Sequence, residues 1–347
     1  MERERMRYID AVRTQGKSLR ASRTAVTDRL QSLDLTPWRQ RRLGLVGMGA
    51  SSNAISAALP GYWAAGLAAA SWSGSEFGLA GPAASAEAVI AVSQTGKSAE
   101  VYAALQATGC PRLVVTDVPD SPLTGLAEAV VPLALLPDSN VRTIGYTGTI
   151  QALGLLADAL AGGDRTAAAG QTWEDAADEL EARLPAAEEL AEGLLPRLRG
   201  VTAFDVVGSG VHAGTALQGA LLLREVCKLP ATGYETYQYL HGPIEAAEAG
   251  RVVVAIGGAR EAKLAADLAA AGSEVLYVQA GGTAGAGEAM SGGGQGVPAT
   301  FAVTAADPLA QAVLAILPLQ AITGQLAEDL GLPDGEFRYH QDDTKVG

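Results

Sequence analysis

The sequence predicts an α/β protein in which one domain, built on a mainly parallel β-sheet, occurs twice. From residue 43 onward, short runs rich in Val, Ile and Leu alternate with Ala- and Leu-rich helical stretches, a pattern typical of βαβ units. Three features also recur at a nearly constant separation, which indicates an internal duplication. The glycines of 47–49 recur at 208–210, the apolar run ending at Val92 recurs as the run ending at Ile256, and the run 112–116 recurs at 274–278.

The first half of the chain begins with a predicted amphipathic helix. Eleven of the 25 Lys and Arg residues fall within the first 42 residues, interleaved with apolar residues at helical spacing. We expect these basic residues on the solvent-facing side of the helix. Strands are then expected at 43–47, 88–92, 112–116 and 130–135, with a helix at 149–161.

The second half follows an acidic helical stretch, 173–194, that joins the two copies. Strands are expected at 204–207, 252–256, 274–278 and 300–303, and a long apolar helix at 309–330. The Gly-rich stretch 281–296 is expected to form a surface loop. These features divide the chain into a helical lead-in (1–40), a first domain (41–168), an acidic linking helix (169–198), a second domain (199–333) and a C-terminal tail (334–347).

Composition and charge exclude several classes of protein. With 48% hydrophobic and 18% charged residues, the chain has the composition of a folded, enzyme-like protein. Its net charge of −13 would repel a polyanion, so no nucleic-acid partner is expected. Its two cysteines, Cys110 and Cys227, lack the spacing of a zinc site. We find neither a signal-like N-terminus nor a long apolar run, and we therefore expect a cytoplasmic protein without a membrane span.

A hydroxyl-rich loop, Ser93-Gln94-Thr95-Gly96-Lys97-Ser98, follows one of the predicted buried strands and precedes a helical run. The N-terminus of a helix presents backbone N–H groups and the positive end of the helix dipole, and hydroxyl groups add further donors. Lys97 contributes a positive charge, so the loop suits a phosphate. Ser and Thr are also ordinary helix-capping residues, and the loop alone leaves both interpretations open.

The glycines after the first strand do not complete a dinucleotide-binding motif. In Gly47-Met48-Gly49-Ala50-Ser51-Ser52 the last position of G-x-G-x-x-G is a serine, and no acidic residue ends the next strand. Ser51 and Ser52 are instead expected at the sheet edge that carries Ser93. The second half has Gly257-Gly258-Ala259-Arg260 in place of the hydroxyl loop, so the two copies are predicted to differ in function.

Several motifs in order along the chain resemble one known family. They are the Ser51 turn, Ser75-Glu76-Phe77, the loop 93–98, Gln218-Gly219-Ala220 with Arg224-Glu225, and His241-Gly242-Pro243. Together they resemble the double SIS (sugar isomerase) domain family, which includes the isomerase half of glucosamine-6-phosphate synthase and aminosugar-phosphate isomerases, deaminases and deglycases. The resemblance covers nearly the whole chain. It implies two tandem flavodoxin-like, three-layer α/β/α SIS domains related by duplication, and a homodimer.

The resemblance also implies roles for individual residues. The substrate phosphate would be held by Ser51, Ser93, Gln94, Thr95 and Ser98. Glu225 would move a proton between C1 and C2 of an open-chain sugar, and His241 would open the sugar ring in the site of the neighbouring subunit. Lys345, in a tail over the active site, would contact the sugar carbonyl. Lys97 and Arg142 are expected as further contacts to a negatively charged substrate.

Enolisation of this kind needs a carboxylate and a group that titrates near neutrality, and it needs neither a metal nor another cofactor. The sequence departs from the family at Leu222, where the synthase has a second catalytic lysine. Three interpretations therefore stay open. The protein is an isomerase or deaminase of sugar phosphates, a non-catalytic phosphosugar-binding regulatory protein, or a lyase or deglycase on the same scaffold.

Overall fold

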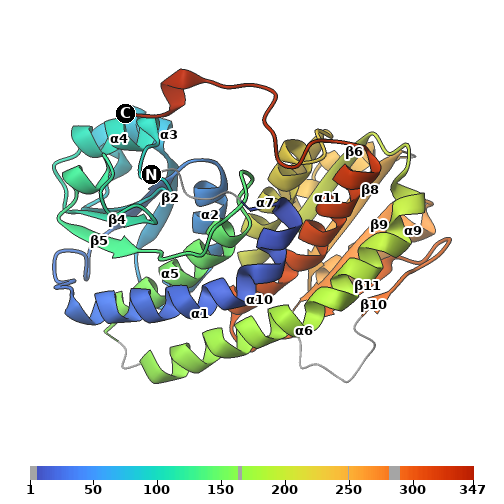
Figure 1. The fold of residues 1–347 in the computed structure, drawn as a ribbon, viewed down its shortest axis with the longest axis horizontal. Helices are drawn as coiled ribbons and strands as arrows, with labels where there is room; N and C mark the ends of the chain where they lie inside the picture. Colours follow the sequence, from blue (N-terminus) through green and yellow to red (C-terminus); the bar gives the residue numbers. More distant parts are fainter. Residues whose placement is uncertain (1–5, 163–165, 249, 281–289) are drawn as a thin grey trace. The chain divides into compact units, whose positions relative to one another are not determined.

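The computed structural model describes residues 6–162, 166–248, 250–280 and 290–347. The chain forms two compact units, and each contains one of the two sheets (Figure 1). The first-sheet unit consists of Lys17–Leu136, Ile144–Glu174 and Arg338–Gly347. The second-sheet unit consists of Met1–Gly16, Pro137–Thr143 and Asp175–Phe337. Neither unit is one continuous stretch of sequence.

Five parallel strands form the first sheet, in the order β2-β1-β3-β4-β5. They are β1 (Leu43–Gly47), β2 (Ala69–Ser73), β3 (Ala88–Val92), β4 (Arg112–Thr116) and β5 (Ala129–Pro132). All residues of β1 and β3 are buried, as expected of central strands covered on both faces. The sequence did not reveal β2, because Ala69-Ala70-Ser71-Trp72-Ser73 is small and polar, which an edge strand tolerates.

Helices cover both faces of the first sheet. The helix α2 (Gly49–Ala64) packs beside α5 (Ile144–Leu160), and α3 (Gly74–Ala80) packs beside α4 (Ala99–Ala107). The core between the sheet and the second pair includes Val46, Phe77, Val89, Val101 and Leu105. The long α1 (Tyr8–Ser32) precedes the sheet, and two short turns, η1 (Gly81–Ala84) and η2 (Thr124–Leu126), complete the connections.

The second sheet has six strands, in the order β10-β11-β9-β8-β6-β7. They are β6 (Ala203–Gly208), β7 (Ala231–Glu235), β8 (Arg251–Gly257), β9 (Glu274–Ala280), β10 (Met290–Ser291) and β11 (Ala299–Val303). Only β10, paired with β11, is antiparallel among the described strands. Without β10, the order repeats that of the first sheet strand for strand, which confirms the predicted duplication. This order is the one found in flavodoxin-like folds.

Helices also cover both faces of the second sheet. They are α6 (Thr166–Leu198), α7 (Val211–Glu225), α8 (Thr236–Leu240), α9 (Ala259–Ala270), α10 (Pro308–Ala315) and α11 (Leu317–Asp329). The short turn η3 (Pro243–Ala246) follows α8, and the short turn η4 (Asp342–Thr344) belongs to the first-sheet unit. The core under α8 and α9 includes Val207, Tyr239 and Leu264. The tandem three-layer α/β/α architecture predicted from the sequence is therefore confirmed.

Two further sequence predictions can be compared with these elements. The long apolar helix expected at 309–330 is two helices, because Pro318 lies in the first turn of α11 and lacks the N–H that would continue α10. The Gly-rich loop prediction concerns 281–296, of which 281–289 lie outside the described residues and 290–291 form β10.

One described helical stretch, Pro308–Asp329, is apolar and long enough to cross a membrane by length and composition. In the structure, however, 89% of its apolar window is buried inside the protein. Both of its helices pack on α7, so the stretch belongs to the core of the second-sheet unit.

Candidate functional site

The hydroxyl loop connects β3 to α4 at the carboxyl edge of the first sheet. Its backbone is tied to the loop after β4, since the carbonyl oxygen of Gln94 accepts hydrogen bonds from Asp117 N at 3.0 Å and from Thr116 Oγ1 at 3.2 Å. Gly96 has φ +63°, and a Cβ atom there would collide with Ser121. The loop therefore needs glycine at this position, both for its left-handed backbone and for its close packing.

The hydroxyl groups of Ser93 and Ser98 face each other across this loop, with their Oγ atoms 3.1 Å apart. Ser98 is the N-cap residue of α4, but its side chain makes no capping hydrogen bond. The simple capping interpretation is therefore wrong for Ser98. Its hydroxyl is directed to Ser93, which is itself 2% exposed, and so stands at the positive end of the α4 dipole.

Gln94 adds an amide to the same loop. Its side chain lies against Gly145 at the start of α5, where a Cβ atom would collide with the amide. The amide Oε1 is buried, and it has no hydrogen-bond partner within the described ranges. A buried polar atom without a partner is costly, because its lost hydrogen bond with water is not replaced.

Ser51 is brought to the same sheet edge. It lies in the first turn of α2, which begins directly after β1, and the last residue of β1, Gly47, pairs with Val92 of β3. Because the carboxyl ends of neighbouring parallel strands meet at one edge, the Ser51 turn and the loop 93–98 are adjacent there. Thr95 and Lys97 belong to this loop, and the side chain of Lys97 is exposed.

The end of the tail pairs with the hydroxyl loop. Ser98 and Lys345 form an antiparallel β-bridge, and Val346 N donates to the carbonyl oxygen of Lys97 at 2.9 Å. The turn η4, just before Lys345, packs on α4. The structure therefore brings Lys345 to the loop that the sequence singled out.

Glu225, the predicted base, is the last residue of α7 in the second-sheet unit. Burial raises the pKa of its carboxyl group above the ordinary value. Three positive charges oppose this rise, and they belong to Arg224, Lys228 and Arg142. A carboxylate with a raised pKa accepts a proton more readily near neutral pH, which is what a general base requires.

Arg142 is held close to α7 by its backbone, and its side chain bonds within its own segment. Its carbonyl oxygen accepts from Gln218 Nε2 at 3.2 Å, and its Nη1 donates to the carbonyl oxygen of Ser139 at 3.1 Å. Arg142 therefore belongs with Glu225 in the second-sheet unit, whereas Lys97 belongs to the first-sheet unit. The two predicted substrate contacts thus lie in different units.

His241 lies at the end of α8, where its N–H donates to the carbonyl oxygen of Gln238 at 3.2 Å. Its side chain is exposed. The following Gly242 has φ +139°, so the chain turns sharply into η3. This position leaves the imidazole available on the surface of the second-sheet unit.

The second sheet carries its own carboxylate where the first sheet carries the hydroxyl loop. The helix α9 starts two residues after the end of β8, and Glu261 in its first turn is 2% exposed. Ser209 Oγ, Thr236 Oγ1 and Gly258 N donate to this carboxylate at 2.9, 2.6 and 3.1 Å. Glu261 was not among the residues predicted from the sequence, although the short strand-to-helix connection was a signal for it. In the second copy, the hydrogen-bond donors at this sheet edge thus bind a carboxylate of the protein itself.

His212 is buried near this carboxylate, and burial lowers the pKa of its imidazole to about 4, against the opposing charge of Glu261. Its Nδ1 has no hydrogen-bond partner among the residues described here. Within these same residues, no group of three His, Cys, Asp or Glu side chains is arranged as a metal site.

No protein-family profile matches the chain. It is 32% identical over 182 residues to the glutamine–fructose-6-phosphate aminotransferase (isomerizing) of Thermococcus kodakarensis, covering 48% of this chain and 29% of that protein. It is 28% identical over 261 residues to the corresponding protein of Caulobacter vibrioides, covering 69% and 41%. The chain thus spans less than half the length of these relatives.

Solved structures share the fold across nearly the whole chain. The C-terminal domain of glucosamine-fructose-6-phosphate aminotransferase from Francisella tularensis matches with a TM-score of 0.77 at 14% identity, covering 96% of this chain and 99% of that one. Glucosamine-6-phosphate deaminase from Thermotoga maritima matches with a TM-score of 0.74 at 18% identity, covering 97% and 98%. The chain is therefore homologous to the isomerase (SIS) domain of the glutamine–fructose-6-phosphate aminotransferases, and it has the fold of two tandem SIS (sugar isomerase) domains.

Proposed function

We propose that the protein is an enzyme that binds a phosphorylated ketose, aldose or aminosugar and catalyses its enolisation between C1 and C2, as an isomerase or an aminosugar-phosphate deaminase. The observation that carries the proposal is the pair of hydroxyl groups of Ser93 and Ser98, 3.1 Å apart at the N-terminus of α4. Two hydroxyl donors, backbone N–H groups and a helix dipole together favour a phosphate. The relatives that share the fold act on sugar phosphates according to their names.

In this proposal the first-sheet unit anchors the substrate. Its phosphate accepts hydrogen bonds from Ser51, Ser93, Gln94, Thr95 and Ser98. Lys97 adds a positive charge at the mouth of the loop, and Lys345 approaches the carbonyl end of the sugar from the tail. The β-bridge between Ser98 and Lys345 supports this role, because it fixes the tail beside the phosphate loop.

The second-sheet unit supplies the proton chemistry. Glu225 removes the proton from C2 of the open-chain aldose, an enediol forms, and the proton returns to C1 while the carbonyl group moves to C2. No atom is gained or lost in this step. In a deaminase, the same proton transfer gives an enolamine and then a ketimine, and water hydrolyses the ketimine to the ketose phosphate and ammonia. His241 opens the sugar ring beforehand, and Arg142 contacts the negatively charged substrate.

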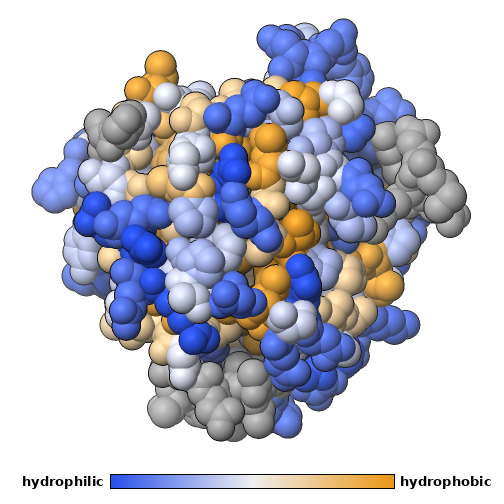
Figure 2. Space-filling model, turned by 90° about the vertical axis from the view of Figure 1, so that its left-hand side faces the viewer, coloured by the Kyte–Doolittle hydropathy of each residue, from blue (hydrophilic) through white to orange (hydrophobic). Residues whose placement is uncertain are grey.

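We further propose a homodimer in which His241 reaches the site of the partner subunit. The exposure of His241 supports this arrangement. Large hydrophobic side chains are also exposed, among them Trp63, Leu79 and Tyr237. Figure 2 shows hydrophobic residues gathered between hydrophilic ones on one side of the molecule, a feature of surfaces that meet a partner.

The proposal also covers the class of substrate, the location of the protein in the cell and the need for a cofactor. The net charge of −13 favours a small-molecule substrate over a nucleic acid, and we propose a cytoplasmic protein that does not associate with membranes or require a cofactor. The chain is divided, in this proposal, into a lead-in at 1–40, SIS domains at 41–168 and 199–333, a linking helix at 169–198 and a tail at 334–347.

A second candidate function is that of a non-catalytic phosphosugar-binding regulator. The observation that favours it is Leu222, which is fully buried in α7 one turn before Glu225, where the synthase resemblance implies a lysine. A protein that had lost its chemistry would keep the phosphate loop alone. A lyase or deglycase would keep both the loop and Glu225, but it would release products other than an isomer.

The experiment that separates these functions incubates the protein with hexose and aminohexose 6-phosphates in deuterated buffer. Thermal shift measures binding, and mass spectrometry measures deuterium at C2 in the same samples. We expect one ligand to stabilise the protein and to gain deuterium. Stabilisation without exchange would favour the regulator, and the appearance of cleavage products would favour the lyase or deglycase.

The matched variants are Glu225→Gln and Glu192→Gln, since Glu192 is exposed on α6. Glu225→Gln is expected to bind the ligand but to lose the exchange, while Glu192→Gln keeps both. If Glu225→Gln exchanges at the wild-type rate, Glu225 is not the base. If no phosphosugar stabilises the wild-type protein, the proposed phosphate site is wrong.

A further inference from the structure

Lys228 lies three residues after Glu225 in an unusual backbone conformation. Its φ is +58°, in the left-handed region that residues with a Cβ atom rarely adopt. Glycine or asparagine would occupy this position more easily. A lysine held in such a conformation is expected to make contacts that offset the strain.

The ammonium group of Lys228 joins the end of α7 to the beginning of the tail. Its Nζ donates to the carbonyl oxygens of Glu225 and Glu336, both at 2.5 Å. The same Nζ lies 5.8 Å from the centroid of the Phe337 ring, within the range of a cation–π contact. One side chain thus contacts the backbone of the proposed base and two successive tail residues.

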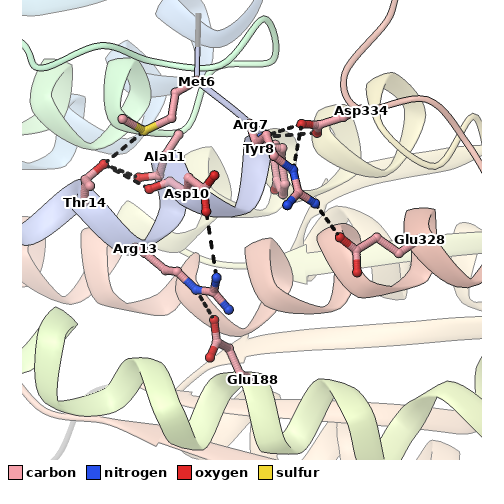
Figure 3. A network of polar contacts seen from close by, with 10 residues as sticks. All are labelled: Met6, Arg7, Tyr8, Asp10, Ala11, Arg13, Thr14, Glu188, Glu328 and Asp334. Carbon is pink, nitrogen blue, oxygen red and sulfur yellow. Dashed lines mark hydrogen bonds and ion pairs between the residues drawn. The ribbon is translucent and has the colours of Figure 1, made fainter.

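Other contacts fix the residues just before Glu336. Both carboxylate oxygens of Asp334 accept from Tyr8 N at 3.1 Å, and Arg7, the residue just before α1, extends toward Asp334 and Glu328 (Figure 3). Gly335 is buried and packs near Val141. Residues 334–337, here called the tail root, are therefore held at each successive position within the second-sheet unit.

The charged surroundings of Glu225 also include Lys228. The charged groups that lower the pKa of Glu225 are Arg224 and Lys228 near the end of α7 and Arg142 from the segment 137–143. The charge of Glu225 in turn raises the pKa of Tyr8 in α1. Leu222 is buried and apolar, so the preceding turn of α7 places no charge at that position. Lys228 thus supplies a positive charge from the residues that follow Glu225.

We infer that Lys228 is a positioning residue, which fixes the tail root against Glu225 and holds a positive charge beside the carboxylate. The inference rests on the proposed function, since it takes Glu225 as the base and the tail that ends at Lys345 as part of the site. Lys228 itself does not touch the reacting atoms. It acts through Glu225 and through the residues that begin the tail.

The test compares Lys228→Met, Lys228→Asn and Lys228→Arg with the matched control Lys263→Met. Asparagine tolerates the left-handed backbone, so Lys228→Asn removes the ammonium group without added strain. This variant keeps the test possible if Lys228→Met fails to fold. Lys263 is an exposed lysine on α9 that is paired with Asp267 at 2.6 Å, so its loss removes a surface charge from a different helix.

The first measurement needs no substrate and uses cleavage of the native protein by trypsin after Arg338, an exposed residue directly after the tail root. We expect cleavage to become about tenfold faster in Lys228→Met and Lys228→Asn, as for loss of one hydrogen bond to a charged group. Lys228→Arg and Lys263→Met should be cleaved at the wild-type rate. Unchanged cleavage in both Lys228→Met and Lys228→Asn would overturn the positioning role.

The second measurement follows the titration of the Glu225 carboxyl group by NMR and, in parallel, the pH profile of C2 exchange. Loss of the Lys228 charge should move both midpoints to higher pH, and Lys228→Arg should restore them. Midpoints that do not move would contradict the electrostatic part of the inference. If the wild-type protein exchanges no substrate proton, the proposed function fails, while trypsin cleavage and carboxyl titration still decide the role of Lys228.

Discussion

The Oγ atoms of Ser93 and Ser98 lie 3.1 Å apart, although five positions of sequence separate the two residues. Gly96 makes this approach possible, because its left-handed backbone folds the loop back on itself at the end of β3. Two hydroxyl groups so close together can donate to two oxygens of the same phosphate. In the proposed function, these two hydroxyl groups bind the phosphate group of the substrate.

Replacement of either serine by alanine tests the phosphate site. Ser93→Ala and Ser98→Ala should each weaken binding of a hexose 6-phosphate by about 10- to 100-fold, since a hydrogen bond to a charged group contributes roughly 1.5–3 kcal/mol. Calorimetric titration measures the change. Ser32→Ala, at the exposed end of α1, serves as the control. Equal affinity in Ser93→Ala, Ser98→Ala and the wild type would remove these hydroxyl groups from the site.

Replacement of Gly96 by alanine tests the shape of the loop. The new methyl group would meet Ser121, and the backbone would stay at a positive φ, so Gly96→Ala should destabilise the protein by at least 1–2 kcal/mol, roughly the cost of a left-handed residue. Urea unfolding measures this. Gly109→Ala is the matched control, because nothing lies within 4 Å of a Cβ atom there. A similar stability of the two variants would show that the loop does not require glycine.

Because the pKa of Glu225 is raised, the substitution Glu225→Gln is predicted to increase the stability of the protein while it abolishes the activity. A carboxyl group whose pKa is raised by burial favours folding while it is protonated, and this contribution is lost as the pH rises through the folded-state pKa. Glu225→Gln should therefore unfold at a higher temperature than the wild type at pH 7, with a smaller difference in acid, while C2 exchange is lost. Calorimetry at several pH values measures the stability. A variant that is less stable than the wild type at pH 7 would contradict this prediction.

The buried His212 predicts a loss of stability in acid. Because burial lowers the pKa of its imidazole to about 4, the stability that neutral His212 provides above its ordinary pKa of 6.5 is lost as the pH falls through 4. The difference corresponds to up to about 3 kcal/mol in the free energy of unfolding. Urea unfolding of His212→Gln between pH 7 and 4 should show a flatter dependence than the wild type. His340→Gln, in the exposed tail, should behave as the wild type does.

Mixing of variants tests whether His241 acts in the partner's site. Inactive Glu225→Gln and inactive His241→Ala subunits should regain C2 exchange when they are unfolded and refolded together, because one site of each mixed dimer then has both groups intact. Up to about half of the mixed dimer's sites become functional if each site combines two subunits. Continued inactivity of the mixture, with dimers formed normally, would place both groups in the same subunit's site.

The central strands of both sheets could be predicted from the sequence, since buried parallel strands are continuous apolar runs such as Ala88–Val92. The edge strands β2 and β7 could not, because Gly233 in β7 and the serines of β2 carry no β-strand preference and depend on their neighbours for pairing. Thr149, predicted to begin a helix, lies inside α5, which starts at Ile144. The missed first turn includes two glycines, which mask a helical start.

The residues of the candidate site, too, could be predicted from the sequence only in part. The loop 93–98 stands out by its hydroxyl groups, and Glu225 and His241 were found through family motifs. Glu261 and Lys228 were missed, because their importance comes from partners far along the chain, such as Ser209 and Glu336. A single sequence gives the residue types at a sheet edge, but it does not give the side chains that close around them.

The hydrogen bond from Tyr8 N to Asp334 joins residues 326 positions apart, and it belongs to a unit assembled from three separate stretches of sequence. During synthesis, the first turn of α1 must therefore wait for nearly all of the chain described here before its partner emerges. Contacts of such high sequence separation close late and slow folding. A fragment that ends between the two sheets would contain Tyr8 but not Asp334, so the first turn of α1 gains this hydrogen bond only when the residues after the second sheet are present.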